Sequence, residues 1–510
     1  MEKKEKILSI SVLCVFALYI ICSILINTKG LYLFFESDMY ADLVLSKYIW
    51  NQKTLFPDGW VFGNQYYVIS TPVLMALLNG IFDNAFVSLR VATAIMMILI
   101  FISYYWMLRP FAKKISIYVG LLLIIASLIG CEIGKQLEGQ IFYLGVSYYS
   151  SYLITLLLTC GCYLRIANNI NNSKYMIVLT ALLSFACGMQ SLRQTVVMVL
   201  PLIICSVIIK NRKSIKYSLL ILVVNIFGIV TIKTINPQNV SIYGSSEIVN
   251  PKEWTSRVLG CLDSLKKITG IRWILKGNPI GLFGILLVFI VIIVVYNSFK
   301  ERKDYQLFPA IILFIFGILG VCAACTFTNT NIRYIYLFPW YALVAISGTQ
   351  LIEIIINRKL NDIVLFSSIS IFIFLSLCNL YVSYGNEIHD SIINKETVEK
   401  EVGEYIITNN YKYVYGEWVK LGKFMPYMND EVLGGSWIGE PFQIIGYLNP
   451  LDIYNEDNNN KAVYLLYDEE VESALKSAQK RDIQLNKIVE FNNGEIQLFV
   501  SNKQLMYFKK

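Results

Sequence analysis

Three carboxylates stand close together just after the first long apolar segment of the chain, which covers residues 7–27. The sequence there reads Glu36-Ser37-Asp38-Met39-Tyr40-Ala41-Asp42. Carboxylates beside a membrane cost free energy unless they are solvated, paired or used in chemistry. Asp38 is the candidate general base, because a carboxylate can accept the proton of an attacking hydroxyl group. Glu36 would orient or bind the attacking molecule, and Asp42 lies one helical turn after Asp38 on the same face.

A structural role for Asp38 is the alternative. Residues 38–50 can form a helix, and an aspartate at the start of a helix commonly caps it by accepting a backbone N–H. Asp38 could also be a solvated acid in a loop. The residue types alone do not choose between a base, a cap and a loop acid.

Three arginines near the ends of predicted membrane spans form a second group. Arg90 opens one span, Arg193 lies between two spans, and Arg333 opens another. A guanidinium group binds phosphate through two parallel hydrogen bonds and stabilises negative charge that develops on a leaving group. The alternative is that these side chains reach lipid headgroups or make structural pairs.

Polar and aromatic residues between the third and fourth predicted spans add further candidates. Glu138 and Tyr148, together with Asp42, are candidates for binding an acceptor or a sugar. Tyrosines in such places also form the aromatic belt at membrane interfaces. We expect no cofactor, because the sequence contains no nucleotide-binding motif. We also expect no zinc site, because no CxxC pair is spaced with histidines and the chain has a single histidine. Outer acids such as Glu36, Asp38 and Glu138 could bind Mg²⁺ or Mn²⁺ through oxygen, but nothing requires it.

Membrane-spanning helices must position these residues. The chain is 56% apolar and 16% charged, and its mean hydropathy is +0.55. Many apolar stretches approach the ~20 residues that cross a hydrocarbon core of ~30 Å. The pattern predicts an all-α polytopic membrane protein whose first span is a retained anchor. The eleven predicted spans lie near residues 7–27, 86–108, 115–131, 141–164, 175–191, 194–210, 216–234, 279–299, 306–326, 333–356 and 361–384.

The positive-inside rule gives the predicted orientation. If the short segment 68–82, which contains Pro72, does not span, the basic clusters all fall on one side, and this side is the cytoplasm. These clusters are Lys3/Lys4/Lys6, Arg109/Lys113/Lys114, Arg165/Lys174, Lys210/Arg212/Lys213/Lys216, Lys300/Arg302/Lys303 and Arg358/Lys359. Segment 68–82 is then an outer interfacial helix. The net charge of +8 follows in large part from this topology, so it needs no nucleic-acid partner.

The domain organisation follows from the same topology. Residues 1–384 are predicted to form a membrane-embedded catalytic domain, with loop 28–85 as its first outer element. Residues 385–510 are predicted to form a small extracytoplasmic α/β domain. Its predicted elements are a helix near 394–409, strands at 411–415 and 462–467, a helix at 469–481, and a hairpin of strands 488–491 and 496–500 that turns at Asn493-Gly494.

Together these features resemble the GT-C superfamily of integral-membrane glycosyltransferases. The likeness is greatest to the bacterial relatives of protein O-mannosyltransferases and of the aminoarabinose transferase that acts on lipid A. It rests on the acidic motif at 36–42, the helix with Pro72, the span opened by Arg90, the pattern Gly188…Arg193…Leu200-Pro201, and the pattern Arg333-Tyr334…Pro339. Two positions depart from the family pattern: Met39 replaces the second acid of a common Asp-Glu pair, and Thr71 replaces the first residue of a Pro-Pro pair.

The resemblance implies a sugar donor linked to a polyprenyl phosphate, an extracytoplasmic acceptor in the cell envelope, and inversion at the anomeric carbon. Asp38 matches the position of the family's catalytic acid, and Arg333 fits its late phosphate-binding loop, with Arg193 and Arg90 as further candidates for the lipid phosphate. Three alternatives stay open. The chain could be a flippase or transporter of lipid-linked glycans, a polymerase or ligase for diphosphate-linked oligosaccharides, or an assembly factor that kept the fold and lost the activity.

Overall fold

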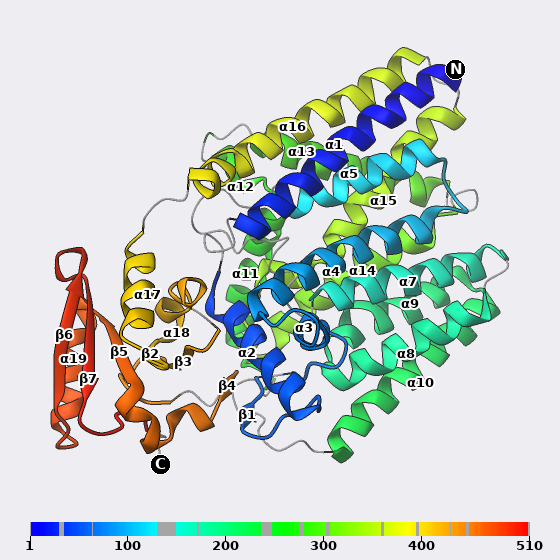
Figure 1. The fold of residues 1–510 in the computed structure, drawn as a ribbon. Coiled ribbons are helices and arrows are strands. Elements are labelled where there is room, and N and C mark those ends of the chain that lie inside the picture. Colours follow the sequence, from blue (N-terminus) through cyan, green and yellow to red (C-terminus); the bar gives the residue numbers. More distant parts are fainter. Residues whose placement is uncertain are drawn as a thin grey trace.

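A bundle of long apolar helices makes up most of the molecule, and a small sheet lies beyond one end of it (Figure 1). This computed structural model describes residues 2–29, 35–63, 65–129, 149–170, 173–235, 247–275, 277, 280–301, 306–358, 362–393, 397–428, 430–444 and 448–507. One apolar core runs through the bundle, the first outer loop and part of the C-terminal unit, since buried residues of all three belong to a single contact cluster.

The predicted spans have counterparts among the helices of the described residues. Eight helices are long and apolar enough to cross a membrane, and three shorter apolar helices cover Lys114–Ser127, Lys174–Gln190 and Thr195–Ile209. The bundle helices are α1 (Glu2–Lys29), α4 (Ala85–Leu108), α5 (Lys114–Ile129), α7 (Tyr149–Ala167), α8 (Lys174–Gln190), η2 (Thr195–Val199) with α9 (Leu200–Ile209), α10 (Arg212–Ile235), α13 (Ile280–Lys300), α14 (Phe308–Phe327), α15 (Pro339–Asn357) and α16 (Asp362–Ile393). The all-α polytopic fold is therefore confirmed.

Short helices cover the end of the bundle that faces the sheet. The apolar segment around Pro72 forms α3 (Thr71–Asn79), which has nine residues. At ~1.5 Å per residue such a helix is about 14 Å long, too short to cross a bilayer. The other short elements at this end are α2 (Ser37–Gln52), η3 (Pro251–Glu253), α11 (Trp254–Ile268), α12 (Arg272–Leu275) and η4 (Tyr334–Leu337).

The C-terminal unit is a five-stranded sheet with the strand order β3-β2-β5-β7-β6. β3, β2 and β5 are parallel to one another, and β7 is antiparallel to both β5 and β6. Its strands are β2 (Tyr413–Glu417), β3 (Leu433–Trp437), β5 (Ala462–Tyr467), β6 (Leu485–Phe491) and β7 (Ile496–Ser501), and its helices are α17 (Val398–Thr408), α18 (Trp418–Leu421), η5 (Met425–Tyr427), η6 (Asp452–Tyr454), η7 (Glu456–Lys461), α19 (Asp468–Gln479) and η8 (Asn492–Gly494).

The C-terminal unit matches its predicted elements, including the hairpin that turns at Asn493-Gly494, but its five-stranded sheet contains a strand that was not predicted, β3. A second, two-stranded sheet pairs β1 (Trp60–Val61) of the first outer loop with β4 (Asn449–Pro450). The domain boundary predicted at residue 384 falls inside α16, which continues to Ile393. The division into two domains stays a prediction.

Candidate active site

The helix that carries Asp38 begins one residue before it. Glu36 takes the N-cap position with an extended backbone (φ −135°, ψ 171°), and its carbonyl accepts the amide of Tyr40 at 3.0 Å. Asp38 is therefore not the cap of α2. It lies in the first turn, where a negative charge interacts favourably with the helix dipole.

Asp38 faces Arg333, so two residues selected from distant parts of the sequence lie side by side. Asp38 Oδ2 is 3.5 Å from Arg333 Nη1, and the two side chains are 32% and 36% exposed. Ion pairs as open as this one contribute only ~0.2–1 kcal/mol to stability. The pair itself therefore adds little to the stability of the fold.

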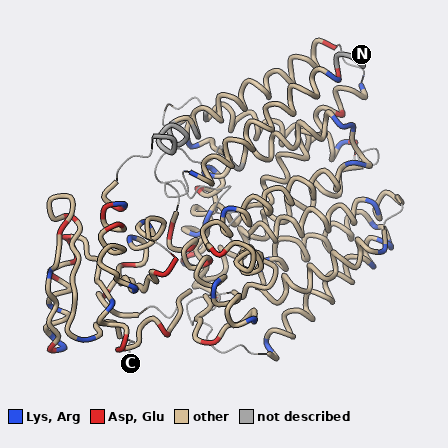
Figure 2. The backbone as a smooth tube through the Cα atoms, in the orientation of Figure 1, with Lys and Arg blue, Asp and Glu red and all other residues tan. Residues whose placement is uncertain are grey.

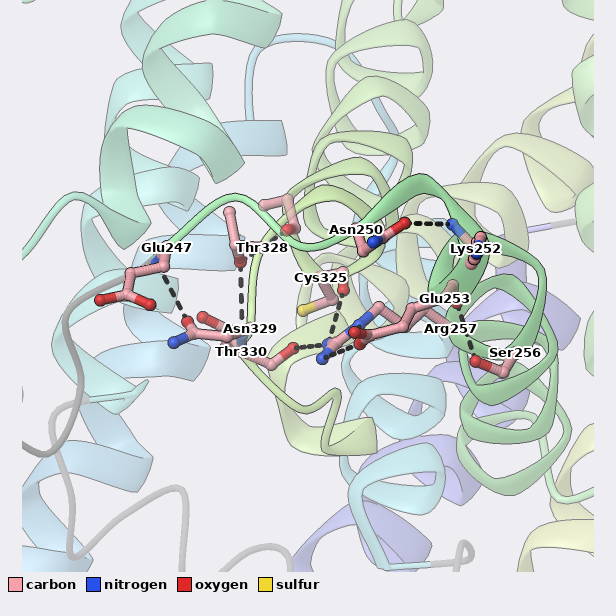
Figure 3. Close-up of polar contacts among 11 residues, drawn as sticks. Glu247, Asn250, Lys252, Glu253, Ser256, Arg257, Cys325, Thr328, Asn329 and Thr330 are labelled. Atoms are coloured by element: carbon pink, nitrogen blue, oxygen red, sulfur yellow. Dashed lines mark hydrogen bonds and ion pairs between the residues drawn. The ribbon is translucent and has the colours of Figure 1, made fainter.

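The loop that presents Arg333 is held by the second outer loop. Residues 247–249 run antiparallel to residues 327–329, with an isolated bridge between Ile248 and Thr328. The amide of Asn329 donates to the carbonyl of Glu247 at 2.9 Å, and Asn329 Oδ1 accepts the amide of Glu247 at 3.2 Å (Figure 3). After this anchor Arg333 takes an extended conformation and caps η4, which leads into α15. The position of Arg333 is thus fixed on both sides.

Arg257 on α11 is a second arginine at this loop, and the sequence did not single it out. Its Nη1 lies 3.4 Å from the carbonyl of Thr330 and 3.5 Å from that of Cys325. Glu253, one turn earlier on α11, holds the same guanidinium at 3.3 Å (Figure 3). The side chain of Arg257 is only 18% exposed. In the sequence, Glu253 and Arg257 look like an ordinary i,i+4 surface pair, so spacing could not reveal that Arg257 reaches the loop.

Arg193 joins the same loop through aromatic rings. It lies between α8 and η2, and its guanidinium carbon is 4.4 Å from the ring centre of Tyr336 and 5.1 Å from that of Tyr149. Tyr336 is three residues after Arg333. The two rings are stacked with centres 6.0 Å apart. Arginine over an aromatic face keeps its charge while its plane is supported on one side.

A cavity of about 540 Å³ opens beside Arg193. Most of its lining is apolar, and two cations, Arg193 and Lys233, lie on it. The lining residues are Gln65, Tyr66, Gly188, Met189, Gln190, Ser191, Leu192, Arg193, Val196, Val197, Ile229, Ile232, Lys233, Val321, Ala324, Cys325, Thr328, Thr330 and Tyr336. A mostly apolar cavity that also carries cationic side chains suits a lipid chain that ends in an anionic group.

A second hollow of about 320 Å³ lies next to this cavity, and Cys325 lines both. Its lining is more polar and includes Glu253, Ser256, Arg257 and Asn331. Residues of the segment 325–336 therefore line both hollows, and the same segment carries Arg333, the partner of Asp38.

Gln190 is a structural residue of the site that the sequence reading passed over. Its Oε1 accepts the amides of Val68 at 2.9 Å and Ile69 at 2.8 Å, and its carbonyl accepts the amide of Tyr66 at 3.0 Å. These bonds tie the segment before α3 to the end of α8, which brings Tyr66 to the cavity. Gln190 stands three residues before Arg193, so the motif that drew attention to Arg193 could have suggested it.

Asp42 differs from Asp38 in its surroundings. It is 3% exposed, which leaves little surface for a substrate. Burial raises the pKa of its carboxyl well above the ordinary 3.8, the negative charge of Asp38 adds to the rise, and a hydrogen bond with Tyr67 opposes it. The protonated form of Asp42 is therefore favoured.

The remaining candidates have separate positions. Arg90 lies on α4, where its backbone carbonyl accepts Asn27 Nδ2 at 2.9 Å. Its Nε is buried without a hydrogen-bond partner among the described residues, and no contact there joins it to the Asp38–Arg333 pair. Glu138 and Tyr148 lie outside the described residues. No cluster of three or more His, Cys, Asp or Glu that could hold a metal ion occurs in the part of the chain that the structure describes.

These features define a class of fold, a polytopic bundle of apolar helices with short helices and a small α/β unit at one end. The chain superimposes on the crystal structure of ArnT from Cupriavidus metallidurans bound to undecaprenyl phosphate with a TM-score of 0.53, over 97% of this chain and 99% of that chain. The sequence identity is 9%, so the likeness concerns the fold alone. No protein-family model and no curated protein sequence matches the chain.

Proposed function

We propose that this protein is a membrane glycosyltransferase that moves a sugar from a polyprenyl-phosphate donor to an extracytoplasmic acceptor in the cell envelope. The observation that carries the proposal is that one segment, residues 325–336, holds Arg333, the partner of Asp38, and also lines a mostly apolar cavity of about 540 Å³ that bears Arg193. The fold is that of ArnT, whose crystal structure is bound to undecaprenyl phosphate. This likeness supports a lipid-linked donor.

In the proposed reaction the acceptor hydroxyl attacks the anomeric carbon of the donor sugar. The bond from that carbon to the phosphate oxygen breaks, and the proton of the hydroxyl passes to the Asp38 carboxylate. Attack opposite the leaving group inverts the configuration. Negative charge grows on the leaving lipid phosphate, and Arg333 and Arg193 stabilise it. Holding donor and acceptor together in one site supplies much of the rate by proximity.

The two hollows would divide the substrates between them. The larger cavity would take the first part of the lipid chain and the phosphate, because its lining is mostly apolar and carries Arg193 and Lys233. The smaller hollow would take a hydroxylated group, since Glu253, Ser256 and Asn331 offer it hydrogen bonds. Catalysis at the segment 325–336 would need both to be filled.

The charge distribution supports the proposed orientation in the membrane. Lys and Arg gather at the end of the bundle that holds the N-terminus, and the C-terminal unit lies at the opposite end (Figure 2). By the positive-inside rule the N-terminal end faces the cytoplasm. The site and the C-terminal unit would then be extracytoplasmic, where flipped lipid-linked sugars are presented.

The test is a transfer assay with purified protein in lipid and a panel of radiolabelled polyprenyl-phosphate sugars. Label should leave the lipid with wild type, and Asp38→Asn and Arg333→Ala should abolish most of this release. Release that survives both substitutions would refute the site. Movement of intact labelled lipid between leaflets without release would instead indicate a flippase, and release only from diphosphate-linked oligosaccharides would indicate a ligase or polymerase.

A further inference from the structure

The helix that carries Asp38 is held on one side by the C-terminal unit, far along the chain. The hydroxyl of Ser37, the residue before Asp38, donates to the carbonyl of Trp418 in α18. The hydroxyl of Tyr40, two residues after Asp38, accepts the backbone amide of Gly434 in β3 at 2.6 Å. Asp38 thus stands between two residues that are bonded to the backbone of the C-terminal unit.

Gly422 sets how closely α2 approaches this unit. A Cβ atom built on Gly422 would lie 2.6 Å from both the backbone nitrogen and the hydroxyl oxygen of Ser37. Atoms cannot approach so closely, so any side chain at this position must push the start of α2 away.

Contacts further along the helix hold the same arrangement. Lys47 pairs with Asp430, with 3.7 Å between Nζ and Oδ1, and the other carboxylate oxygen of Asp430 accepts the amide of Ala85 at 2.7 Å. Tyr48 donates to Asp452. Asp430 therefore ties α2 to the first residue of α4, and the C-terminal unit contacts α2 over most of its length.

The interface between α2 and the C-terminal unit is packed rather than open. The hollow lined by Ser37, Tyr40, Trp418, Gly422 and Gly434 has a volume of about 10 Å³. This is at the lower limit for a single water molecule. The buried residues on both sides belong to one core cluster, so this face of the C-terminal unit acts as a support and not as a binding cleft.

We propose that the C-terminal unit positions Asp38 for catalysis, with Ser37, Tyr40 and Gly422 as positioning residues. The proposal rests on the proposed function, in which Asp38 accepts the acceptor's proton. A displacement of a reacting group by about 1 Å can cost about 10²-fold in rate. The contacts at Ser37 and Tyr40 restrain the start of α2 against such a displacement, while the lipid phosphate sites on Arg193 and Arg333 lie on other elements.

The test compares three full-length variants with wild type. Gly422→Ala crowds the start of α2, and Tyr40→Phe removes only the hydroxyl that accepts the Gly434 amide. Gly403→Ala is the matched control: the three atoms nearest its Cβ all belong to Tyr427, the closest at 2.8 Å, so it crowds the C-terminal unit by a similar amount without touching α2 itself. The measurements are kcat and KM for the sugar donor, direct binding of polyprenyl phosphate, and hydrogen exchange of the α2 amides.

Gly422→Ala and Tyr40→Phe should lower kcat by about 10–100-fold. Binding of polyprenyl phosphate should stay within about twofold of wild type, because neither residue lines the lipid cavity, and the amides of residues 43–49 should exchange faster. Gly403→Ala should leave all three quantities near wild type.

Two results would overturn the proposal. One is faster exchange in α2 with unchanged kcat, which would show that the position of this helix does not limit the reaction. The other is an equal loss of kcat in Gly403→Ala, which would point to general damage of the C-terminal unit. If wild type itself transfers no sugar from any donor, the proposed function fails first, and the proposal fails with it.

Discussion

The substitution Asp38→Asn separates a structural ion pair from a catalytic group, because the two roles predict very different magnitudes. Asp38 and Arg333 are about one-third exposed and 3.5 Å apart. An ion pair with this exposure contributes ~0.2–1 kcal/mol to the free energy of unfolding. Asparagine keeps the shape of the side chain, so the variant should fold normally and lose at most about 1 kcal/mol of stability.

The expected effect on activity is much larger. General base catalysis contributes about 10²–10⁴-fold to a rate, which corresponds to roughly 2.7–5.4 kcal/mol of transition-state stabilisation at ~1.36 kcal/mol per tenfold. The loss of kcat should therefore exceed the loss of stability several-fold on the free-energy scale. A purely structural pair would give activity losses no larger than the loss of folded protein.

The assay measures kcat and KM for sugar transfer beside thermal unfolding in the same lipid, for Asp38→Asn, Arg333→Ala and the double variant. The double variant should be about as inactive as Asp38→Asn alone, because groups that act in one transition state are not additive. Asp58→Asn is the matched control, since it removes an exposed carboxylate of the same outer loop. A kcat for Asp38→Asn within about threefold of wild type, in folded protein, would refute the assignment of the base.

Three further predictions concern residues around this pair. Asp42→Asn should become progressively more stable than wild type as pH rises above about 4. Because the pKa of the Asp42 carboxyl is raised in the folded protein, the unfolded chain loses this proton at a lower pH, and wild-type stability falls between the two pKa values. Thermal unfolding measured across pH would detect the difference. Arg193→Ala should weaken polyprenyl-phosphate binding about tenfold or more, by loss of a charged hydrogen-bond donor, and Arg193→Lys should restore only part of it. Arg257→Gln should lower kcat by loosening residues 328–333, measured beside the surface control Lys252→Gln.

Each of these three predictions would be contradicted by a different result. A constant stability difference for Asp42→Asn across pH would show that Asp42 is charged in the native protein. Unchanged lipid binding in Arg193→Ala would show that the lipid phosphate does not bind at Arg193 in the larger cavity. An Arg257→Gln variant with normal kcat would show that the anchoring of residues 327–329 to residues 247–249 is enough to hold Arg333 in place.

The bundle could be predicted because bilayer thickness imposes a length on each apolar segment. Each predicted span has a helical counterpart, and α3 is too short to cross. The same constraint made part of the site predictable. Spans of similar length place every second connection in one layer, so acids and arginines at those connections become neighbours. Asp38 and Arg333 were both chosen as residues at span ends, and they are in contact.

The parts that the sequence did not reveal depend on contacts between loops. Arg257 reaches the carbonyls of Cys325 and Thr330 only because residues 247–249 pair with residues 327–329. Such two- or three-residue pairings are too short to leave an alternating pattern. For the same reason β1 and β4 were not predicted, and the Gly434-Gly435 pair in β3 gave no strand signal because glycine is depleted in strands.

Asp38 and Asp42 show why residue type was not enough to assign roles. They lie one turn apart on α2, and the sequence favoured Asp38 as the base without showing how their surroundings differ. Asp38 is about one-third exposed beside Arg333, whereas Asp42 is 3% exposed beside Tyr67. Two ionised carboxylates about 6 Å apart would repel by roughly 3 kcal/mol at an effective dielectric constant of ~20. In the proposed reaction they would also place two negative charges beside the donor phosphate. Burial favours the protonated form of Asp42, which lessens this repulsion and leaves Asp38 as the exposed acid of α2. The Asp38 carboxylate lies at the start of α2 next to Arg333. In the proposed reaction, the donor phosphate would bind Arg333 in place of Asp38.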